Sequence, residues 1–443
     1  MFHQESSTHR RTMWAGVVAI IASLTLLLSG CSNPTDSNTK GPEGKTTIIL
    51  WYQYTGNNAS HAMELIDEYN ASQANYEVVG EFGAPSDQFN AKIINALNTK
   101  TAPNMILGDS TPQSVGRIVD IDGIVPLDTF LNNPASKITR ANFTEAMLGS
   151  GTFNGKLYAI PTDAGSFMIC YNKKLFEEAG ITTLPTTWAE LHEVAKKLTK
   201  GTEQYGMYLP IGTGEWPVFT WQAMLWSAGG QFLSADNTKV EFNSDAGIRA
   251  LNAWVDMVKD GSAYPQSLST PNDKNGSGAL TSGIAAMQIN GAYNLGVLDE
   301  GLGADNVGVF KLPGIDHYAM NLGGPVTYIL RGGTEAQEAA AWDFFQWWVS
   351  PETQTKWAKA TGYLPTNLDT ADDPNWQAYL DSNPRIATFA EGVSYAQLRP
   401  SIIKYGEVSE ALSLQIERAL LLQVSSQEAL ATAAANAQAV LDG

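Results

Sequence analysis

The spacing of apolar residues after residue 45 predicts alternating strands and helices. The segment Thr46–Tyr54 (TTIILWYQY) is β-branched and aromatic, which is typical of a buried strand. Apolar residues then recur every three or four positions from Ala62 to Tyr69, which predicts a helix capped by Asn58 or Ser60. The alternation continues with a strand at Tyr76–Phe82, a helix at Asp87–Thr99 and a strand at Asn104–Gly108.

This order of strands and helices predicts a parallel sheet with crossover helices. Ligands of such sheets bind beyond the carboxyl ends of the strands. The loops expected at that edge are Trp51–Thr55, Gly83–Asp87 and Gly108–Thr111.

A second group of elements begins at Gly155–Ile181, where two strands precede a helix that ends at Gly180. Strands are also expected at Gly283–Gly291, leading back towards the first group, and at Asn306–Leu312. Further helices are expected at Val218–Ala228, Ser244–Lys259, Thr334–Trp348, Glu352–Ala360, Val408–Leu422 and Gln427–Leu441. Most tryptophans on these helices recur at helical spacing and are interpreted as core, namely Trp221, Trp226, Trp342, Trp347, Trp348 and Trp357.

The N-terminal segment reads as an export signal. Arg10 and Arg11 precede an apolar run, Trp14–Leu28, that is too short for a comfortable membrane span. The run ends in Leu-Ser-Gly-Cys31, which resembles the lipobox of bacterial lipoproteins, so Cys31 is the expected lipidation site. We expect a signal peptide over 1–30 and a flexible polar tether over 31–45. The alternative is a plain signal peptide or signal anchor with a chance cysteine.

Composition narrows the classes of function. The chain has 443 residues, which suits two domains, and its net charge is −18. Such a surface repels nucleic acid and anionic membranes, and it favours an uncharged ligand. Two cysteines are too few for a disulfide framework, and Cys170 lies in an apolar stretch typical of a buried thiol.

Several segments occur in a characteristic order: NGKLYAIPTDAGSFMICYNKKLFEEAGI with LPTTWAEL, AAMQINGAYNLGVL with NVGVFKLPG, NLGGPVTYIL, EAAAWDFFQWWVSPETQTKWAKATGYLPTN and SQEALATAAANAQAVL. Together they resemble the family 1 extracellular solute-binding proteins of ABC importers, the group that contains maltodextrin-binding and glycerol-3-phosphate-binding proteins. The resemblance implies an α/β fold of the periplasmic-binding-protein type II, in which two lobes close on a ligand cleft. It also implies a monomeric, lipid-anchored protein outside the cytoplasm that delivers its ligand to ABC permease subunits. No catalytic residue, cofactor or metal ion is expected.

The resemblance also implies a hinge of two or three crossings, which we expect near Ile160, Asn290 and Val326. Lobe 1 would then comprise 46–160 plus 291–325, and lobe 2 would comprise 161–290 plus 326–443.

A sugar site needs aromatic platforms for the C–H faces and polar groups for the hydroxyls. The rim loops and the family's binding segments together give the candidate ligand-binding residues. These are Trp51, Tyr54, Asp87, Asp109, Asp163, Gly165, Trp216, Tyr293, Gly323, Gly324 and Tyr363. Trp51 also suits the core, Asp87 also suits a helix N-cap, and Tyr363 also suits a cap over the Trp-rich helix. Tyr293, in the ING-x-aromatic segment, is the strongest single aromatic candidate.

The favoured ligand is a neutral sugar or short oligosaccharide, and two other readings stay open. Binding of glycerol 3-phosphate or a glycerophosphodiester would call for an arginine on the penultimate long helix, where this chain has Ser409 and Glu410; Arg399 lies upstream. A secreted glycoside hydrolase would use a pair of carboxylates, and acidic residues are abundant. Neither a G-x-S-x-G nor an H-E-x-x-H motif is present. A purely structural lipoprotein is disfavoured by the two-lobe architecture.

Overall fold

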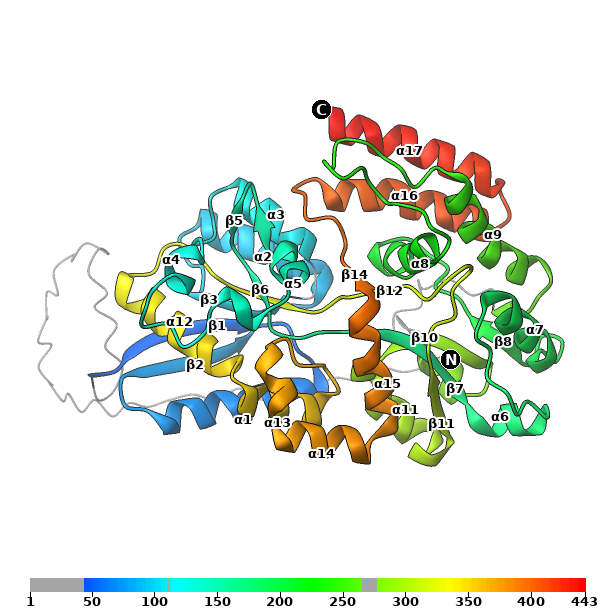
Figure 1. Ribbon diagram of the computed structural model, residues 1–443. Coiled ribbons are helices and arrows are strands. Elements are labelled where there is room, and N and C mark those ends of the chain that lie inside the picture. The colour runs from blue at the N-terminus through cyan, green and yellow to red at the C-terminus, as the bar shows by residue number, and fades with distance from the viewer. Residues whose placement is uncertain (1–43, 110–111, 265–276) are drawn as a thin grey trace, which may run out of the picture. The chain divides into compact units, whose positions relative to one another are not determined.

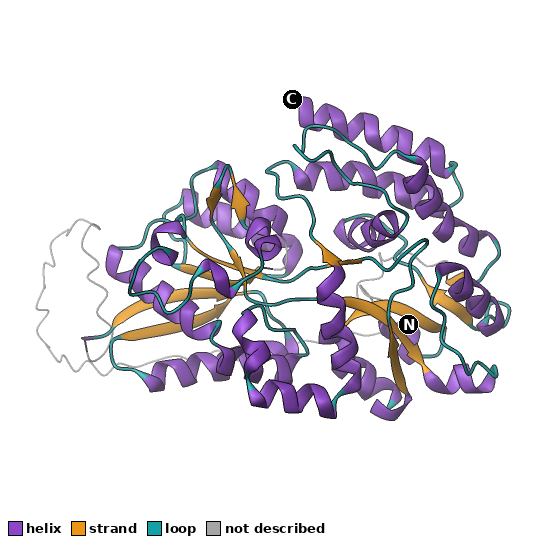
Figure 2. Ribbon diagram, in the orientation of Figure 1, coloured by secondary structure: helices purple, strands orange, loops and turns teal. Residues whose placement is uncertain are grey.

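Two five-stranded sheets organise the chain, each flanked by helices (Figures 1 and 2). A computed structural model describes residues 44–109, 112–264 and 277–443, with the backbone alone at 86–87 and 112–114. Among these residues, every helix is too short or too polar to span a membrane.

The first sheet has the strand order β2-β1-β3-β13-β6. Its strands are β1 (Thr46–Tyr52), β2 (Tyr76–Phe82), β3 (Met105–Asp109), β6 (Ile160–Pro161) and β13 (Val326–Ile329). β1 runs parallel to both β2 and β3, which confirms the predicted parallel sheet, whereas β13 is antiparallel to β3 and β6. The carboxyl ends of β1 and β3 therefore lie at one edge, beside the return strand β13.

The first sheet and the helices around it are called the first half of the molecule, and the second sheet with its helices is called the second half. The helices of the first half come from two separate stretches of the chain. They are α1 (Gly56–Ser72), α2 (Ser86–Asn98), α3 (Pro112–Asp120), α4 (Asp128–Leu131), α5 (Glu145–Ser150), α12 (Glu335–Trp348) and α13 (Pro351–Thr361). α12 packs on β1, and α13 packs on α1. A two-stranded ribbon, β4 (Thr152–Phe153) with β5 (Lys156–Leu157), and the short helix η2 (Arg140–Asn142) complete this half.

The second sheet has the order β11-β7-β10-β8-β9. Its strands are β7 (Phe167–Asn172), β8 (Tyr205–Tyr208), β9 (Ala263–Tyr264), β10 (Ala285–Gly291) and β11 (Val307–Phe310). The longer helices of this half are α6 (Lys173–Glu178), α7 (Trp188–Leu198), α8 (Glu215–Ser227), α9 (Asp245–Lys259), α11 (Leu295–Leu302), α14 (Pro374–Ser382), α15 (Pro384–Gly392), α16 (Tyr405–Leu420) and α17 (Ser426–Asp442). The short elements are α10 (Ser277–Thr281), η3 (Ala292–Asn294), η4 (Ala304–Asn306), η5 (Leu368–Asp372), η6 (Val393–Tyr395), β12 (Met320–Asn321) and β14 (Ala396–Gln397).

The expected division of the chain between the halves was wrong after residue 290. β11 pairs with β7, so residues 291–325, expected in lobe 1, belong with the second sheet. β13 pairs with β3 and β6, so the chain after residue 326, expected in lobe 2, first returns to the first sheet and stays there through α13. The physical reason is that an apolar run specifies a strand but not the sheet that accepts it.

Three segments cross between the halves side by side. The Ala164 and Leu364 backbones exchange two hydrogen bonds of 2.8 Å, and those of Gly165 and Gly323 exchange two of 2.7 and 2.9 Å. The first two crossings lie close to the expected positions at Ile160 and Val326. The expected crossing at Asn290 was wrong, because that residue pairs with Met168 inside the second sheet. The third crossing follows α13 instead.

Helix ends follow the capping chemistry of the sequence. α7, α12 and α17 each begin with a reciprocal capping box, at Thr187, Thr334 and Ser425. α1 differs from expectation, because Thr55 is its N-cap and Asn58 and Ser60 lie inside the helix. Among the residues interpreted as core, Trp221, Trp348 and Trp357 are at most 1% exposed.

Candidate functional site

A large cavity lies between the two halves and opens beside the crossings. It measures about 810 Å³, well inside the range of small-molecule sites. The first half supplies the carboxyl-end loop of β1 with Tyr54, and the second half supplies η3 and α11 with Tyr293. Tyr363, just after α13, completes the aromatic part, and Asn294 and Arg385 are among the polar groups.

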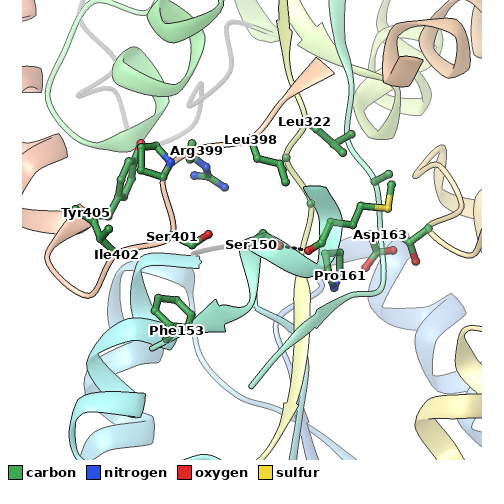
Figure 3. Close-up of a pocket in the computed structure, with 16 residues that line it drawn as sticks. Ser150, Phe153, Pro161, Asp163, Leu322, Leu398, Arg399, Ser401, Ile402 and Tyr405 are labelled. Atoms are coloured by element: carbon green, nitrogen blue, oxygen red, sulfur yellow. Dashed lines mark hydrogen bonds between the residues drawn. The ribbon is translucent and has the colours of Figure 1, made fainter. Parts of the chain in front are cut away.

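A narrower cavity of about 30 Å³ lies against the same crossings. Figure 3 shows Ser150, Phe153 and Pro161 on one side, facing Arg399, Ser401 and Ile402 on the other. This volume admits only a few water molecules. Because its walls come from both halves, its width depends on the angle between them.

Four aromatic rings form a column from the second half to the first. Tyr293 stacks on Tyr363 with 5.1 Å between ring centroids and 21° between planes. The Tyr363 ring is nearly parallel to the Trp357 ring, with 6.4 Å between ring centroids and 3° between planes. Trp357 then packs against Tyr54 at 4.8 Å. The column holds Tyr54, Tyr293 and Tyr363 in fixed positions on the wall of the large cavity.

Asp163 anchors this column at the hinge. It has no exposed surface and accepts hydrogen bonds from the Tyr54 hydroxyl at 2.5 Å, from the Thr162 hydroxyl at 3.0 Å and from the Trp357 indole. Burial raises the pKa of this carboxyl to about 6, although the three hydrogen bonds act in the opposite direction. Because both oxygens are engaged, the carboxyl positions Tyr54 and Trp357 and does not present a free acceptor to a ligand.

Glu215, the first residue of α8, is the centre of a second polar cluster. Its Oε1 accepts from the Arg399 guanidinium at 2.8 Å and from the Tyr405 hydroxyl at 3.0 Å, and its Oε2 accepts from the Ser409 hydroxyl. Gln222 donates to the Tyr405 hydroxyl at 2.9 Å. The cluster therefore ties the start of α8 to the loop before α16 and to α16 itself.

An aromatic wall connects the Arg399 cluster with the large cavity. The Arg399 guanidinium lies 4.7 Å from the centre of the Phe219 ring. Phe219 stacks on Trp216 at 5.8 Å and 24°, and both contact Phe167. Phe167 lies 6.2 Å from Tyr293, which lines the large cavity, whereas Phe167, Trp216 and Phe219 line neither cavity.

Three further candidate residues belong to the first half of the molecule. Trp51 lies in the core of the first half, 9% exposed, with its indole donating to Glu81 and Lys92 over its ring; neither cavity includes it. Asp109 is fully buried at the end of β3 and accepts from the Tyr328 hydroxyl at 2.8 Å. The backbone at Asp87 lies in the first turn of α2, whose N-cap is Pro85, and its side chain lies outside the described residues, as does Cys31.

The three glycines lie where the crossings meet. A Cβ on Gly324 would sit 1.8 Å from the Asp163 carbonyl oxygen, and its φ of +153° also favours glycine. A Cβ on Gly323 would come within 2.8 Å of the Phe219 ring, whereas one on Gly165 would meet the Gly323 oxygen at an ordinary 3.5 Å. Gly323 and Gly324 line the narrow cavity, so their backbones form part of the cleft floor.

Sequence reasoning missed Glu215, Phe167 and Phe219, which pack around Arg399 and Trp216 without lining either cavity. The signal for Glu215 was its place beside Trp216 in the GTGEWP loop, but an acidic residue at a helix start has an ordinary electrostatic explanation. Phe167 and Phe219 lie in apolar stretches, and nothing in those stretches indicates the contacts that both rings make with Trp216. Cys170, interpreted as a buried thiol, is fully buried.

The sequence matches a family model described as bacterial extracellular solute-binding protein over residues 64–384. A relative from Rhizobium meliloti, the sn-glycerol-3-phosphate-binding periplasmic protein UgpB, is 25% identical over 358 residues, covering 77% of this chain and 80% of that protein. A putative binding protein of Brucella abortus is 26% identical over 317 residues, covering 71% of this chain and 74% of that protein.

The structure is similar to several solved binding proteins. The cyclic alpha-maltosyl-1,6-maltose binding protein from Arthrobacter globiformis has a TM-score of 0.78 and 29% identity, over 90% of this chain and all of that chain. UgpB from Mycobacterium tuberculosis, solved with glycerophosphocholine, also has a TM-score of 0.78 at 20% identity, over 90% of this chain and 99% of that chain, and shows the shared fold.

Proposed function

The chain belongs to the bacterial extracellular solute-binding protein family, and on that premise we propose that it captures a neutral sugar or short oligosaccharide for an ABC importer. The single observation that carries the ligand class is the aromatic lining of the cleft: Tyr54, Tyr293 and Tyr363 border a cavity of about 810 Å³ whose walls come from both halves. Aromatic faces suit the C–H faces of a pyranose, and neighbouring amides and hydroxyls suit its hydroxyl groups. The similarity to a maltosyl-maltose binding protein supports the same ligand class.

The mechanism that we propose is closure of the halves around the ligand. Three crossing segments, paired through backbone hydrogen bonds, form a narrow hinge. A ligand that touches Tyr54 on one side and Tyr293 on the other stabilises the closed arrangement, because it binds that state more tightly. The closed form is then the one that the permease subunits receive. In this scheme Tyr54, Tyr293 and Tyr363 contact the ligand, whereas Gly323 and Gly324 line the narrow cavity and Trp216 lines neither.

The carboxyl groups of the large cavity bear on the glycosidase alternative. A glycoside hydrolase needs two carboxyl groups that face the substrate across the cleft. Here the carboxyl groups in the described lining are Asp299 and Glu300, neighbours on α11, and Asp299 is committed to the Arg385 guanidinium at 2.5 and 2.8 Å. This arrangement favours a receptor without turnover.

The proposal is tested by titrating the mature protein calorimetrically with neutral mono- and oligosaccharides, sn-glycerol 3-phosphate and glycerophosphocholine. We expect one neutral saccharide to bind with a one-to-one stoichiometry and to raise Tm. Tyr293→Ala should weaken that binding at least tenfold, because it removes a stacking face. Tyr318→Ala is the matched control, since this tyrosine is 38% exposed and belongs to neither cavity.

Three results would count against the proposal. If only the phosphorylated ligands bound, the ligand class would be glycerol phosphates, as in the name of the rhizobial relative. Release of shorter sugars from the oligosaccharides would show that the protein is an enzyme and not a receptor. If Tyr293→Ala and Tyr318→Ala weakened saccharide binding equally, the aromatic cleft would not be the binding surface.

We also propose that Cys31 carries a lipid that anchors the protein at the outer face of the membrane, as its lipobox-like context suggests. Intact mass measurement after expression in a bacterial host tests this. A diacylglycerol-sized increment on a chain beginning at Cys31, absent in Cys31→Ser, supports the anchor. Equal release of both forms into the medium contradicts it.

A further inference from the structure

The short turn between β10 and α11 carries two neighbouring residues of the large cavity, Tyr293 and Asn294. A Cβ on Gly291 would lie 2.3 Å from the Tyr293 ring, so the ring folds back over this glycine. A Cβ on Gly362, at the end of α13, would lie 2.5 Å from the Ala292 carbonyl oxygen. The turn is therefore closely packed against its own strand and against the first half of the molecule.

Asn290, near the end of β10, holds the side-chain amide of Asn294. Asn290 has no exposed surface, and its Oδ1 accepts hydrogen bonds from the Gly291 backbone N–H at 2.9 Å and from the Asn294 Nδ2 at 2.6 Å. Its own Nδ2 donates to the Ser277 hydroxyl at 3.4 Å. A backbone N–H can only donate, so the contact with Gly291 identifies the Asn290 atom that faces Asn294 as the oxygen.

The orientation of the Asn294 amide follows from this assignment. Its NH2 group must face the oxygen of Asn290, because an amide oxygen in that place would meet another acceptor. An asparagine at a helix N-cap usually accepts a hydrogen bond from the helix backbone, but Asn294, the N-cap of α11, makes no such bond. Its Oδ1 has no hydrogen-bond partner within the described part of the chain. Because Asn294 lines the large cavity, this oxygen is available to a bound molecule.

From this geometry, and on the basis of the proposed function, we infer that Asn294 is a specificity-determining residue of the large cavity and that Asn290 is the residue that positions it. The Asn294 oxygen accepts a hydrogen bond from a hydroxyl of a sugar ring that lies against Tyr293. An amide oxygen can accept but not donate, so it favours ligand groups that carry a proton over deprotonated phosphate or carboxylate oxygens. Asn290 lies outside the cavity lining and acts through the orientation of the Asn294 amide.

The experiment titrates wild type and variants calorimetrically with maltotriose and with every other neutral saccharide that binds wild type in the functional test. Asn294→Ala should weaken binding at least fivefold, because it removes the acceptor of one ligand hydroxyl. Asn290→Leu should weaken binding by a similar factor, because the Asn294 amide is no longer held. The double variant N290L/N294A should bind within twofold of Asn294→Ala, because Asn290 acts through Asn294. Asn290→Asp should bind within twofold of wild type, since it keeps an oxygen that accepts from Gly291 and Asn294.

Asn70→Leu is the matched control for the loss of a structural asparagine. The Asn70 side chain joins α1 to β2 by hydrogen bonds of 2.9 and 2.8 Å with the Val78 backbone, and it lines neither cavity. This variant should lower Tm without changing the affinity for the saccharide. Asn290→Ala replaces Asn290→Leu if that variant does not fold, which circular dichroism decides.

Two results overturn the inference and leave the proposed function intact. One is wild-type affinity in Asn294→Ala. The other is a loss on Asn290→Leu that is as large in the Asn294→Ala background as in wild type. Failure of the proposed function is read separately, from a wild-type protein that binds no neutral saccharide, and this result overturns the inference with it.

Discussion

The hinge and the start of α8 each contain a carboxyl group whose oxygens all accept hydrogen bonds, but the donors differ. At the hinge, Asp163 is fully buried and accepts from three uncharged donors. At the start of α8, Glu215 is partly exposed and one of its donors is the Arg399 guanidinium. The difference has a physical consequence, because a buried charge without a counter-charge is costly whereas a paired one is partly compensated. The hinge carboxyl therefore serves packing and orientation, and the α8 carboxylate compensates the charge of Arg399.

The largest expected effect is the loss of the hinge carboxyl. Asp163→Ala leaves the Tyr54 hydroxyl, the Thr162 hydroxyl and the Trp357 indole, all buried, without their shared acceptor. We expect the free energy of unfolding to fall by about 4 kcal/mol at pH 5, since each buried unpaired donor costs roughly 1–3 kcal/mol and a small cavity adds to the loss. Glu215→Ala should cost about 1–2 kcal/mol, because the Glu215 side chain is 22% exposed and water can replace part of what it provides. Urea unfolding measures both changes in the free energy of unfolding. Equal changes would show that the two carboxyl groups do not differ in their contribution to stability.

The pH dependence of stability sharpens the same contrast. Burial raises the pKa of Asp163 from 3.8 to about 6, so between these values the folded protein binds a proton that the unfolded chain has lost. The stability contributed by the protonated form is complete below about pH 3.8 and is lost as the pH rises through about 6, which amounts to roughly 3 kcal/mol. The difference in unfolding free energy between wild type and Asp163→Asn should therefore change between pH 4 and 7. A flat difference over this range would mean that the carboxyl titrates normally.

Backbone packing at the hinge gives the third test. Gly324→Ala would push a Cβ against the Asp163 carbonyl at 1.8 Å, and its φ of +153° is strained for alanine. Gly214, the N-cap of α8, also has a positive φ of +100°, but no atom lies within 4 Å of its Cβ position. We expect Gly324→Ala to cost about 2–3 kcal/mol and Gly214→Ala about 1 kcal/mol, measured as shifts of the urea midpoint. Comparable losses would show that torsional strain, not contact with the hinge, dominates at both glycines.

The sequence predicted the elements better than it predicted their partners. β1, β2 and β3 followed from apolar runs whose alternation with helices permits few topologies, and the structure confirms their parallel pairing. The run Gly283–Gly291 was correctly interpreted as a strand of the second half, but Asn306–Leu312 was placed with the wrong half, because an apolar pattern is equally compatible with either sheet. The return of Val326–Ile329 to the first sheet depends on a strand pairing across more than 200 residues, which single-sequence patterns do not encode.

The candidate site shows the same limit at the level of side chains. Tyr54, Tyr293 and Tyr363 were identified because the rim of a parallel sheet and the ING-x-aromatic segment point to a cleft, and all three line the large cavity. Asp163 was identified as a polar group of the cleft, but the sequence could not reveal that Trp357 takes one of its oxygens. Trp51 was selected for its place at the end of a strand, and its side chain points into the core of the first half instead.

The smallest effect compares one hydroxyl on each side. Thr162→Val removes one hydrogen bond to Asp163, and Ser409→Ala removes one to Glu215, so each should cost about 1 kcal/mol. Only the hinge substitution should also move the titration of Asp163, because the Thr162 hydroxyl is one of the donors that lower the pKa of that carboxyl. In Thr162→Val the midpoint of the pH-dependent stability change should therefore shift upward, while in Ser409→Ala it should stay at its wild-type position. A shift of equal size in both variants would mean that the two carboxylates belong to one coupled network, and the hinge and α8 sides of the cleft would then have to be treated as a single electrostatic unit.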